Sequence, residues 1–404
     1  MYSTIPALQQ CILSGDPEYQ KIARRKLSRA FSSQAVQGYE PLFLQRADLL
    51  VDRMRDAAGP KVDLKFFLNS FVWDCMAKLF FDEDLRQLED LRTHPWTQTP
   101  ITLVKRSALA IVLLPPSLQV WCKYLFPRLS ERLAPPRCMT DSHGHLRASL
   151  RASKSDVPFW KHIFRDGEQD LTPDGISNTA SSCMIELTRA PKIETNVFIF
   201  AIAGGELTSA ALCGLFVLLV SNPTTMSMLC NEIRSSFTDS STISLACARA
   251  LPYLDACVEE ALRIYPPSPT GLERLTPPQG IAIGGHAVPG GVRVSVAPVA
   301  ANKSPANFIN PEAFAPERWL KTDPSYTGDV HAASQPFSVG PNACIGRNIA
   351  IAQLKVATVK LLYNFDIMRC SDVQHWLRQK AYIIWDREHV RLDANVKQAR
   401  SSDT

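Results

Sequence analysis

The chain has 404 residues, of which 46% are hydrophobic, and its formal net charge is +5. This length suits one large domain or two to three average ones with a well-buried core. The charge is mildly basic and no long Lys/Arg block occurs, so nucleic acid is not expected as a partner. A basic face toward an acidic redox protein or an anionic membrane surface is compatible with it. Eleven cysteines without a Cys-x-x-Cys pair indicate reduced intracellular thiols.

The predicted elements are mostly helices. Amphipathic or apolar patterns predict helices over 17–58, over 62–80 with a start at Asp63, and over 196–220, 250–265 and 347–363. Alternation of β-branched and small residues around Gly and Pro turns predicts hairpins over 279–300 and a final hairpin over 381–392. An apolar run over 100–127 is broken by Pro115-Pro116, residues 135–158 are expected to be loops, and 303–343 to be irregular.

The longest apolar stretch, 196–220, has the length of a membrane span. Glu206, Thr208 and Ser209 at its centre make that interpretation costly, so a buried central helix is expected. The first fifteen residues lack a long apolar core, so no signal peptide or anchor is expected there.

One cysteine lies on a turn rich in Gly and Pro, directly before a predicted helix. The stretch reads Phe337-Ser-Val-Gly340-Pro-Asn-Ala-Cys344-Ile-Gly346. A helix N-terminus stabilises a thiolate through its dipole and free N–H groups, and glycines let the backbone approach a flat cofactor. The alternative is a buried cysteine in a turn. His143-x-His145 has no acidic or Cys partner nearby and is interpreted as a polar loop.

Two further motifs precede the cysteine. Glu260-Ala-Leu-Arg263 places an acid and a guanidinium on one helix face, and Pro316-Glu-Arg318-Trp follows it. Taken alone, the first is usually a solvated surface ion pair.

In this order the three motifs resemble those of the cytochrome P450 superfamily. The resemblance implies a mainly α fold with a small antiparallel β component, lacking the family's N-terminal part, as a single domain over 1–404. It implies haem b as cofactor, with Cys344 as the axial iron ligand in a loop that includes Phe337, Gly340 and Gly346. Glu260, Arg263 and Arg318 would form a buried structural triad, and Arg274 would meet a haem propionate.

The central helix carries Ala203-Gly-Gly-Glu206-Leu207-Thr208, which resembles the family's oxygen-activation motif. Glu206 and Thr208 would then deliver protons to dioxygen at the haem. Leu207 stands at the usual threonine position, and Thr208 lies about 100° further round an ideal helix unless a local bulge brings it round. A Gly-containing core helix is the alternative.

Several positions depart from the family pattern. Asn342 replaces an arginine of the cysteine loop, and Gln20 and Ile22 stand where a His and an Arg usually precede the segment Arg24–Phe31. An extra segment near 177–193 separates Leu171-Thr from the central helix and is expected to be an insertion or a retained intron.

The last third of the chain is most similar to fungal secondary-metabolism members. The resemblance implies hydroxylation or oxidation of a hydrophobic terpenoid or polyketide intermediate, with dioxygen and NADPH-derived electrons delivered by NADPH-cytochrome P450 reductase to a monomer. It implies the endoplasmic reticulum membrane, whereas the lack of an anchor implies the cytoplasm if the start is correct. The alternatives are a non-oxygenating or peroxide-driven haem-thiolate enzyme, and a truncated inactive protein whose lost charge-assisted bonds weaken haem binding.

Overall fold

A computed structural model describes residues 12, 17–98, 101–102, 105, 159, 196, 199–320, 323–369 and 375–397. The expectations for His143-x-His145, for the loops over 135–158 and for the extra segment 177–193 lie outside the described residues, as does nearly all of the run over 100–127.

The first long described segment, 17–98, is mostly helical, as predicted. It contains α1 (Pro17–Leu27), α2 (Ser33–Asp56), α3 (Leu64–Phe81) and the short α4 (Gln87–Asp90). Ser32 caps α2 by accepting from the Ala35 N–H at 3.2 Å, and Asp63 caps α3 by accepting from the Phe66 N–H at 3.3 Å. Each side chain satisfies one N–H that the first helical turn leaves free, so the predicted start at Asp63 is confirmed.

The central helix is widened at one point. Residues Ala203–Leu207 form the π-helical segment η3, which runs directly into α12 (Thr208–Ser221). The helical run Ile199–Ser221 is long and apolar enough to cross a bilayer, but 78% of its most apolar window is buried inside the protein. A core helix is therefore the interpretation that fits. The chain continues through α13 (Pro223–Ser236), α14 (Leu245–Arg249) and α15 (Pro252–Ile264).

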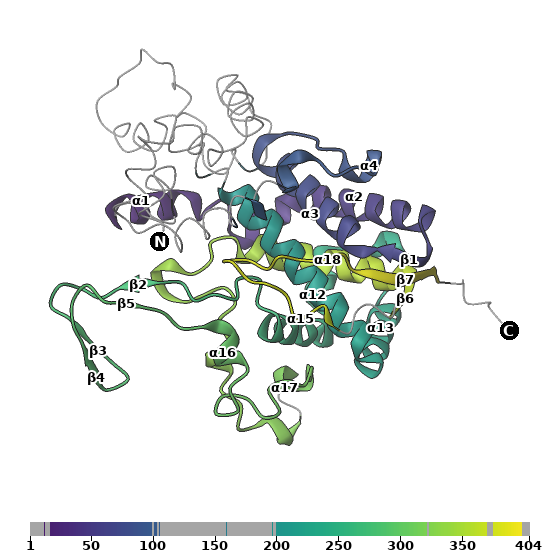
Figure 1. Ribbon diagram of the computed structural model, residues 1–404. Coiled ribbons are helices and arrows are strands. Elements are labelled where there is room, and N and C mark those ends of the chain that lie inside the picture. Colours follow the sequence, from purple (N-terminus) through teal and green to yellow (C-terminus); the bar gives the residue numbers. More distant parts are fainter. Residues whose placement is uncertain are drawn as a thin grey trace, which may run out of the picture.

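Helix α18 (Arg347–Asn364) lies in the middle of the molecule and packs against α2, α12, α13 and α14. Figure 1 shows it running alongside α12 beneath α2 and α3. Its Lys355 and Lys360 are 2% exposed, yet their ammonium groups reach the more exposed Asp255 and Asp48. The aliphatic stems of these lysines thus fill core positions while the charges find partners at the edge of the core.

A three-stranded antiparallel sheet joins distant parts of the chain. Its order is β1 (Gly59–Asp63), β7 (Arg391–Val396), β6 (Phe365–Arg369), with Val62 opposite Leu392 and Ile367 opposite Ala394. The predicted hairpin over 381–392 is therefore wrong. Residues Ala381 and Trp385 form only an isolated bridge, and the strand that starts at Arg391 pairs with β1 and β6.

Two small hairpins confirm the prediction for 279–300. Strands β3 (Ile281–Ile283) and β4 (His286–Val288) pair across a turn in which Gly284 and Gly285 have φ of 57° and 81°, values that favour glycine. Strands β2 (Arg274–Leu275) and β5 (Arg293–Val294) form the base of this arm. The arm lies at the opposite end of the molecule from the three-stranded sheet (Figure 1). The predicted fold class, mainly helical with a small antiparallel component, is confirmed.

The described part of the irregular stretch predicted over 303–343 contains short helical turns. It is preceded by α16 (Pro298–Asn302) and includes α17 (Glu317–Leu320), the 3-10 turns η5 (Pro324–Tyr326), η6 (His331–Ala333) and η7 (Gly340–Asn342). This stretch connects α16 to Cys344.

Candidate functional site

The cysteine loop is closed by its own backbone. The Cys344 N–H donates to the Phe337 carbonyl at 2.7 Å, and the Ala343 N–H donates to the Gly340 carbonyl at 3.0 Å. Gly340 has φ of +73°, a value that a side chain would strain, and it opens the turn η7. These two bonds place the Cys344 sulfur immediately before the first turn of α18.

The Cys344 sulfur meets donors and cations. Burial raises the pKa of the thiol, while hydrogen bonds from the backbone N–H groups of Gly346 and Arg347 and the charges of Arg24 and Arg347 lower it. Cys344 is nevertheless an exposed residue, so a ligand can reach its sulfur. A metal supplies the positive charge that deprotonates such a thiol. An accessible sulfur with two N–H donors therefore fits an iron-bound thiolate.

Residues of the N-terminal region hold this loop from the other side. The Arg24 guanidinium donates to the Ala343 carbonyl, and the Asn348 amide donates to the Phe31 carbonyl at 2.9 Å. Sequence reasoning concentrated on Gln20 and Ile22 and missed Arg24. The sequence shows an Arg24-Arg25 pair in a predicted amphipathic helix. This pattern does not indicate that the first arginine faces the cysteine loop.

The other loop positions are less enclosed. Phe337 is half-buried, with the Arg347 guanidinium 5.6 Å from its ring centre, and Asn342 is exposed in η7. Arg274 is exposed in β2, where its guanidinium donates to the Glu273 carbonyl at 3.1 Å. Its pairing with a haem propionate stays a prediction.

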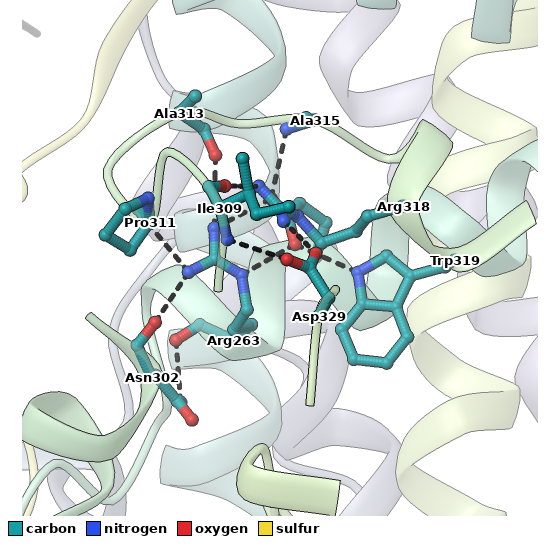
Figure 2. Close-up of polar contacts among 10 residues, drawn as sticks. Arg263, Asn302, Ile309, Pro311, Ala313, Ala315, Arg318, Trp319 and Asp329 are labelled. Carbon is teal, nitrogen blue, oxygen red and sulfur yellow. Dashed lines mark hydrogen bonds and ion pairs between the residues drawn. The ribbon is translucent and has the colours of Figure 1, made fainter. Parts of the chain in front are cut away.

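Glu260, Arg263 and Arg318 come together in the interior. Arg263 donates to both carboxylate oxygens of Glu260 at 2.8 Å, from Nε and Nη2, and the Arg318 Nε donates to Glu260 Oε1 at 2.9 Å. All three side chains are fully buried. The alternative of a solvated surface pair is thus wrong for this motif. Figure 2 shows the two guanidinium groups converging from α15 and α17.

Other groups complete what we call the Glu260 cage, defined as Glu260, Arg263 and Arg318 together with the Trp319 indole and the backbone groups that bond to them. The Trp319 indole donates to Glu260 Oε2 at 2.9 Å, and the Ala315 N–H donates to Oε1 at 3.0 Å. Arg263 also donates to three backbone carbonyls, those of Asn302, Pro311 and Ala313. Each oxygen of the buried carboxylate accepts at least two hydrogen bonds, which offsets its loss of hydration. The contribution of Trp319 was not predicted from the sequence.

The glycines of the central helix face another helix. A Cβ built on Gly205 would lie 2.5 Å from the Trp73 ring, and one built on Gly204 would lie 2.5 Å from the Met76 sulfur. A local bulge in this helix is present as the π segment η3, and the close approach that the glycines permit is to α3.

Glu206 forms a buried ion pair that the sequence did not indicate. Its carboxylate accepts from the Arg387 guanidinium at 2.6 Å, and both side chains are almost fully buried. Arg387 also contacts Asn69 at 3.5 Å. Thr208, two residues along, is 4% exposed, and its N–H donates to the Gly205 carbonyl. The proton-delivery roles of Glu206 and Thr208 stay predictions.

Comparisons with known proteins identify the family. The family model described as Cytochrome P450 matches residues 2–388. Cytochrome P450 monooxygenase efuB of Hormonema carpetanum is 34% identical over 95% of this chain and 74% of its own length. Averantin hydroxylase of Dothistroma septosporum is 32% identical over 93% of this chain and 69% of its own length.

The solved structures give the same fold. The heme domain of cytochrome P450DA superposes with a TM-score of 0.76, covering 98% of this chain and 82% of that chain at 23% sequence identity. With a family model spanning nearly its whole length and relatives above 30% identity, this chain belongs to the cytochrome P450 family of haem-thiolate monooxygenases.

Proposed function

We propose that this monooxygenase hydroxylates or oxidises a hydrophobic small molecule, a terpenoid or polyketide intermediate of fungal secondary metabolism. Dioxygen is the oxidant, and the electrons come from NADPH through NADPH-cytochrome P450 reductase. The observation that carries the proposal is the accessible Cys344 sulfur, held at the N-terminus of α18 by backbone donors. The fungal relatives, one of them named as a hydroxylase, support the substrate class.

Cys344 would hold the haem iron through its thiolate, in a loop shaped by Phe337, Gly340 and Gly346. When bound, the haem supplies dioxygen activation and insertion of one oxygen atom into the substrate. The N–H groups of Gly346 and Arg347 stabilise negative charge on the sulfur.

Two cations are available for the haem carboxylates. Arg24 donates to a carbonyl of the cysteine loop, and Arg274 is the proposed propionate partner on the β2–β5 arm. The Glu260 cage has a structural role, because it holds the irregular stretch before the cysteine loop onto α15. The contacts of Arg318 and Arg263 use several N–H donors of one planar guanidinium group. Lysine, with a single ammonium group, is therefore a poor replacement at either position.

Glu206 and Thr208 are the proposed proton-delivery residues. The contact with Arg387 fixes the Glu206 carboxylate, so a proton relay through this carboxylate requires the pair to loosen. Together with Leu207 at the usual threonine position, this contact favours a second candidate function, a peroxide-driven or non-oxygenating haem-thiolate reaction that needs less proton delivery.

The ferrous–CO spectrum of the purified protein tests the ligand assignment. We expect a thiolate-type Soret band in the wild type and in Cys247→Ala, an exposed free cysteine on α14 that serves as a matched control. Cys344→Ala should lose the band. A thiolate band that survives in Cys344→Ala refutes the assignment.

Labelled dioxygen separates the two candidate reactions. Oxygen from ¹⁸O₂ in an NADPH-dependent product supports the monooxygenase reaction, and product formed without it supports the second candidate. We further propose a monomeric single domain over 1–404 that works at the endoplasmic reticulum membrane. Sedimentation of the protein with and without reductase, and fractionation of fungal membranes, test these points.

A further inference from the structure

The Glu260 cage carries an excess of positive charge. One carboxylate lies between the two guanidinium groups of Arg263 and Arg318, and all three side chains are fully buried. A buried charge without a counter-charge is costly, because protein replaces its hydration shell. The triad that the sequence indicated is therefore incomplete in electrostatic terms.

Asp329 supplies the missing negative charge. Its carboxylate pairs with the Arg318 guanidinium on the side away from Glu260, and its side chain is also fully buried. Its second oxygen accepts from the Ile309 N–H at 2.7 Å. Arg318 thus lies between two carboxylates, and the four charged groups sum to zero. Figure 2 shows Asp329 between Ile309 and Arg318.

The segment that carries Asp329 is held in place by the same contacts. The Asp329 N–H donates to the Tyr326 carbonyl at 3.0 Å, and the next N–H, of Val330, donates to the Asn307 carbonyl at 2.7 Å. His331 stacks on Trp319, whose indole donates to Glu260, at 4.7 Å between ring centres. From here the chain continues through η6 to Phe337, the residue whose carbonyl closes the cysteine loop.

We propose that Asp329 is a positioning residue for the cysteine loop. Its carboxylate balances the charge of the Glu260 cage and fastens residues 323–333 to Arg318, which sets where the chain enters Phe337 and Cys344. The inference rests on the proposed ligation of haem by Cys344. It extends the three-residue motif to a fourth charged member, fifteen positions before the ligand.

Asp323 provides a matched control in the same segment. It caps η5 through the Ser325 N–H at 2.8 Å but lies outside the cage and carries no ion pair to Arg318. Asp329→Asn and Asp323→Asn each remove one carboxylate charge from the segment and change its volume very little. Only the first leaves the cage with an unbalanced guanidinium.

Two measurements on the haem-loaded protein test the proposal: the ratio of thiolate-type to thiol-type ferrous–CO bands, and amide hydrogen exchange over 335–346. We expect Asp329→Asn to lower the ratio severalfold and to speed exchange in that segment, while Asp323→Asn matches the wild type. Asp329→Glu restores the charge and should recover most of the ratio. In an Arg318→Gln background, Asp329→Asn should have little further effect, because the charge that it balances is gone.

Other outcomes overturn the proposal. It fails if Asp329→Asn matches Asp323→Asn in both measurements, or if its effect is undiminished in the Arg318→Gln background. If Asp329→Asn does not fold, Asp329→Glu decides, since loss of the thiolate band despite a restored carboxylate contradicts a charge-balancing role. Failure of the ligand assignment is distinct, because it appears as a thiolate band that survives in Cys344→Ala.

Discussion

Replacing Gly205 by alanine should push the central helix away from α3. The added Cβ would lie 2.5 Å from Cε2 of Trp73 and 2.8 Å from both Cδ2 and Cζ2. The indole ring is 2% exposed and packed on its other sides, so it cannot swing away without disturbing the core. Gly204 provides the control, since its added Cβ meets the Met76 sulfur at 2.5 Å, on a flexible side chain that can adopt another rotamer.

The expected magnitude follows from two opposing terms. Overpacking of a core costs about 1–3 kcal/mol, and a rigid ring favours the upper end. Replacing glycine by alanine within a helix stabilises the helix by about 1 kcal/mol. We therefore expect Gly205→Ala to lower the free energy of unfolding by about 2 kcal/mol, and Gly204→Ala to change it by less than about 1 kcal/mol.

Urea unfolding of the haem-loaded variants, followed by far-ultraviolet circular dichroism, measures this difference. A Trp73→Leu background makes room for the new methyl group, so the cost of Gly205→Ala should largely disappear there. Equal stability of Gly205→Ala and the wild type would refute the steric argument, as would an equal cost in both backgrounds.

Two further predictions concern buried charges. Arg387→Met leaves the Glu206 carboxylate unpaired and should destabilise the protein by about 3–5 kcal/mol in urea unfolding, whereas adding Glu206→Gln should recover much of this loss. Burial raises the pKa of Asp74 to about 6, so the folded state holds this proton more tightly than the unfolded chain does. The Asp74 contribution to stability is therefore present at low pH and is lost as pH rises from about 4 through 6, by on the order of 3 kcal/mol. Between pH 4.5 and 7 the wild type should lose about 2 kcal/mol of stability that Asp74→Asn does not lose, since part of the effect already lies below pH 4.5. Parallel pH profiles of the two proteins would contradict the assignment.

The parts of the fold that were predicted correctly depend on local patterns. The start of α3 follows from the Asp63 cap, and the β3–β4 hairpin follows from two glycines in its turn. The pairing of β7 was missed, because its partners β1 and β6 lie far away in the sequence or across an irregular stretch. Alternation of side chains identifies a strand but not the strand that pairs with it. The prediction from the sequence paired this strand with the nearby apolar residues of 381–385, which was wrong.

The residues of the candidate site also differ in whether a local sequence pattern identifies them. Cys344 and the Glu260–Arg263 pair belong to short motifs with fixed spacing, so the sequence alone singled them out. Arg24, Asp329 and Arg387 are single charged residues without a local pattern, and each gains its importance from a partner brought close by folding. Only the coordinates distinguish such residues from the exposed charges around them.

The bonds that join the cysteine loop to the N-terminal region have a consequence for biosynthesis. Arg24 and Ala343 are 319 positions apart, and Asn348 and Phe31 are 317 positions apart. A ribosome releases the N-terminal residues first, so α1 emerges long before its partners exist. Contacts between residues so far apart in the sequence also form late in folding, because bringing them together costs the conformational entropy of a long loop. Cofactor capture by this enzyme is thus expected near the end of synthesis, and α1 must remain unaggregated until then.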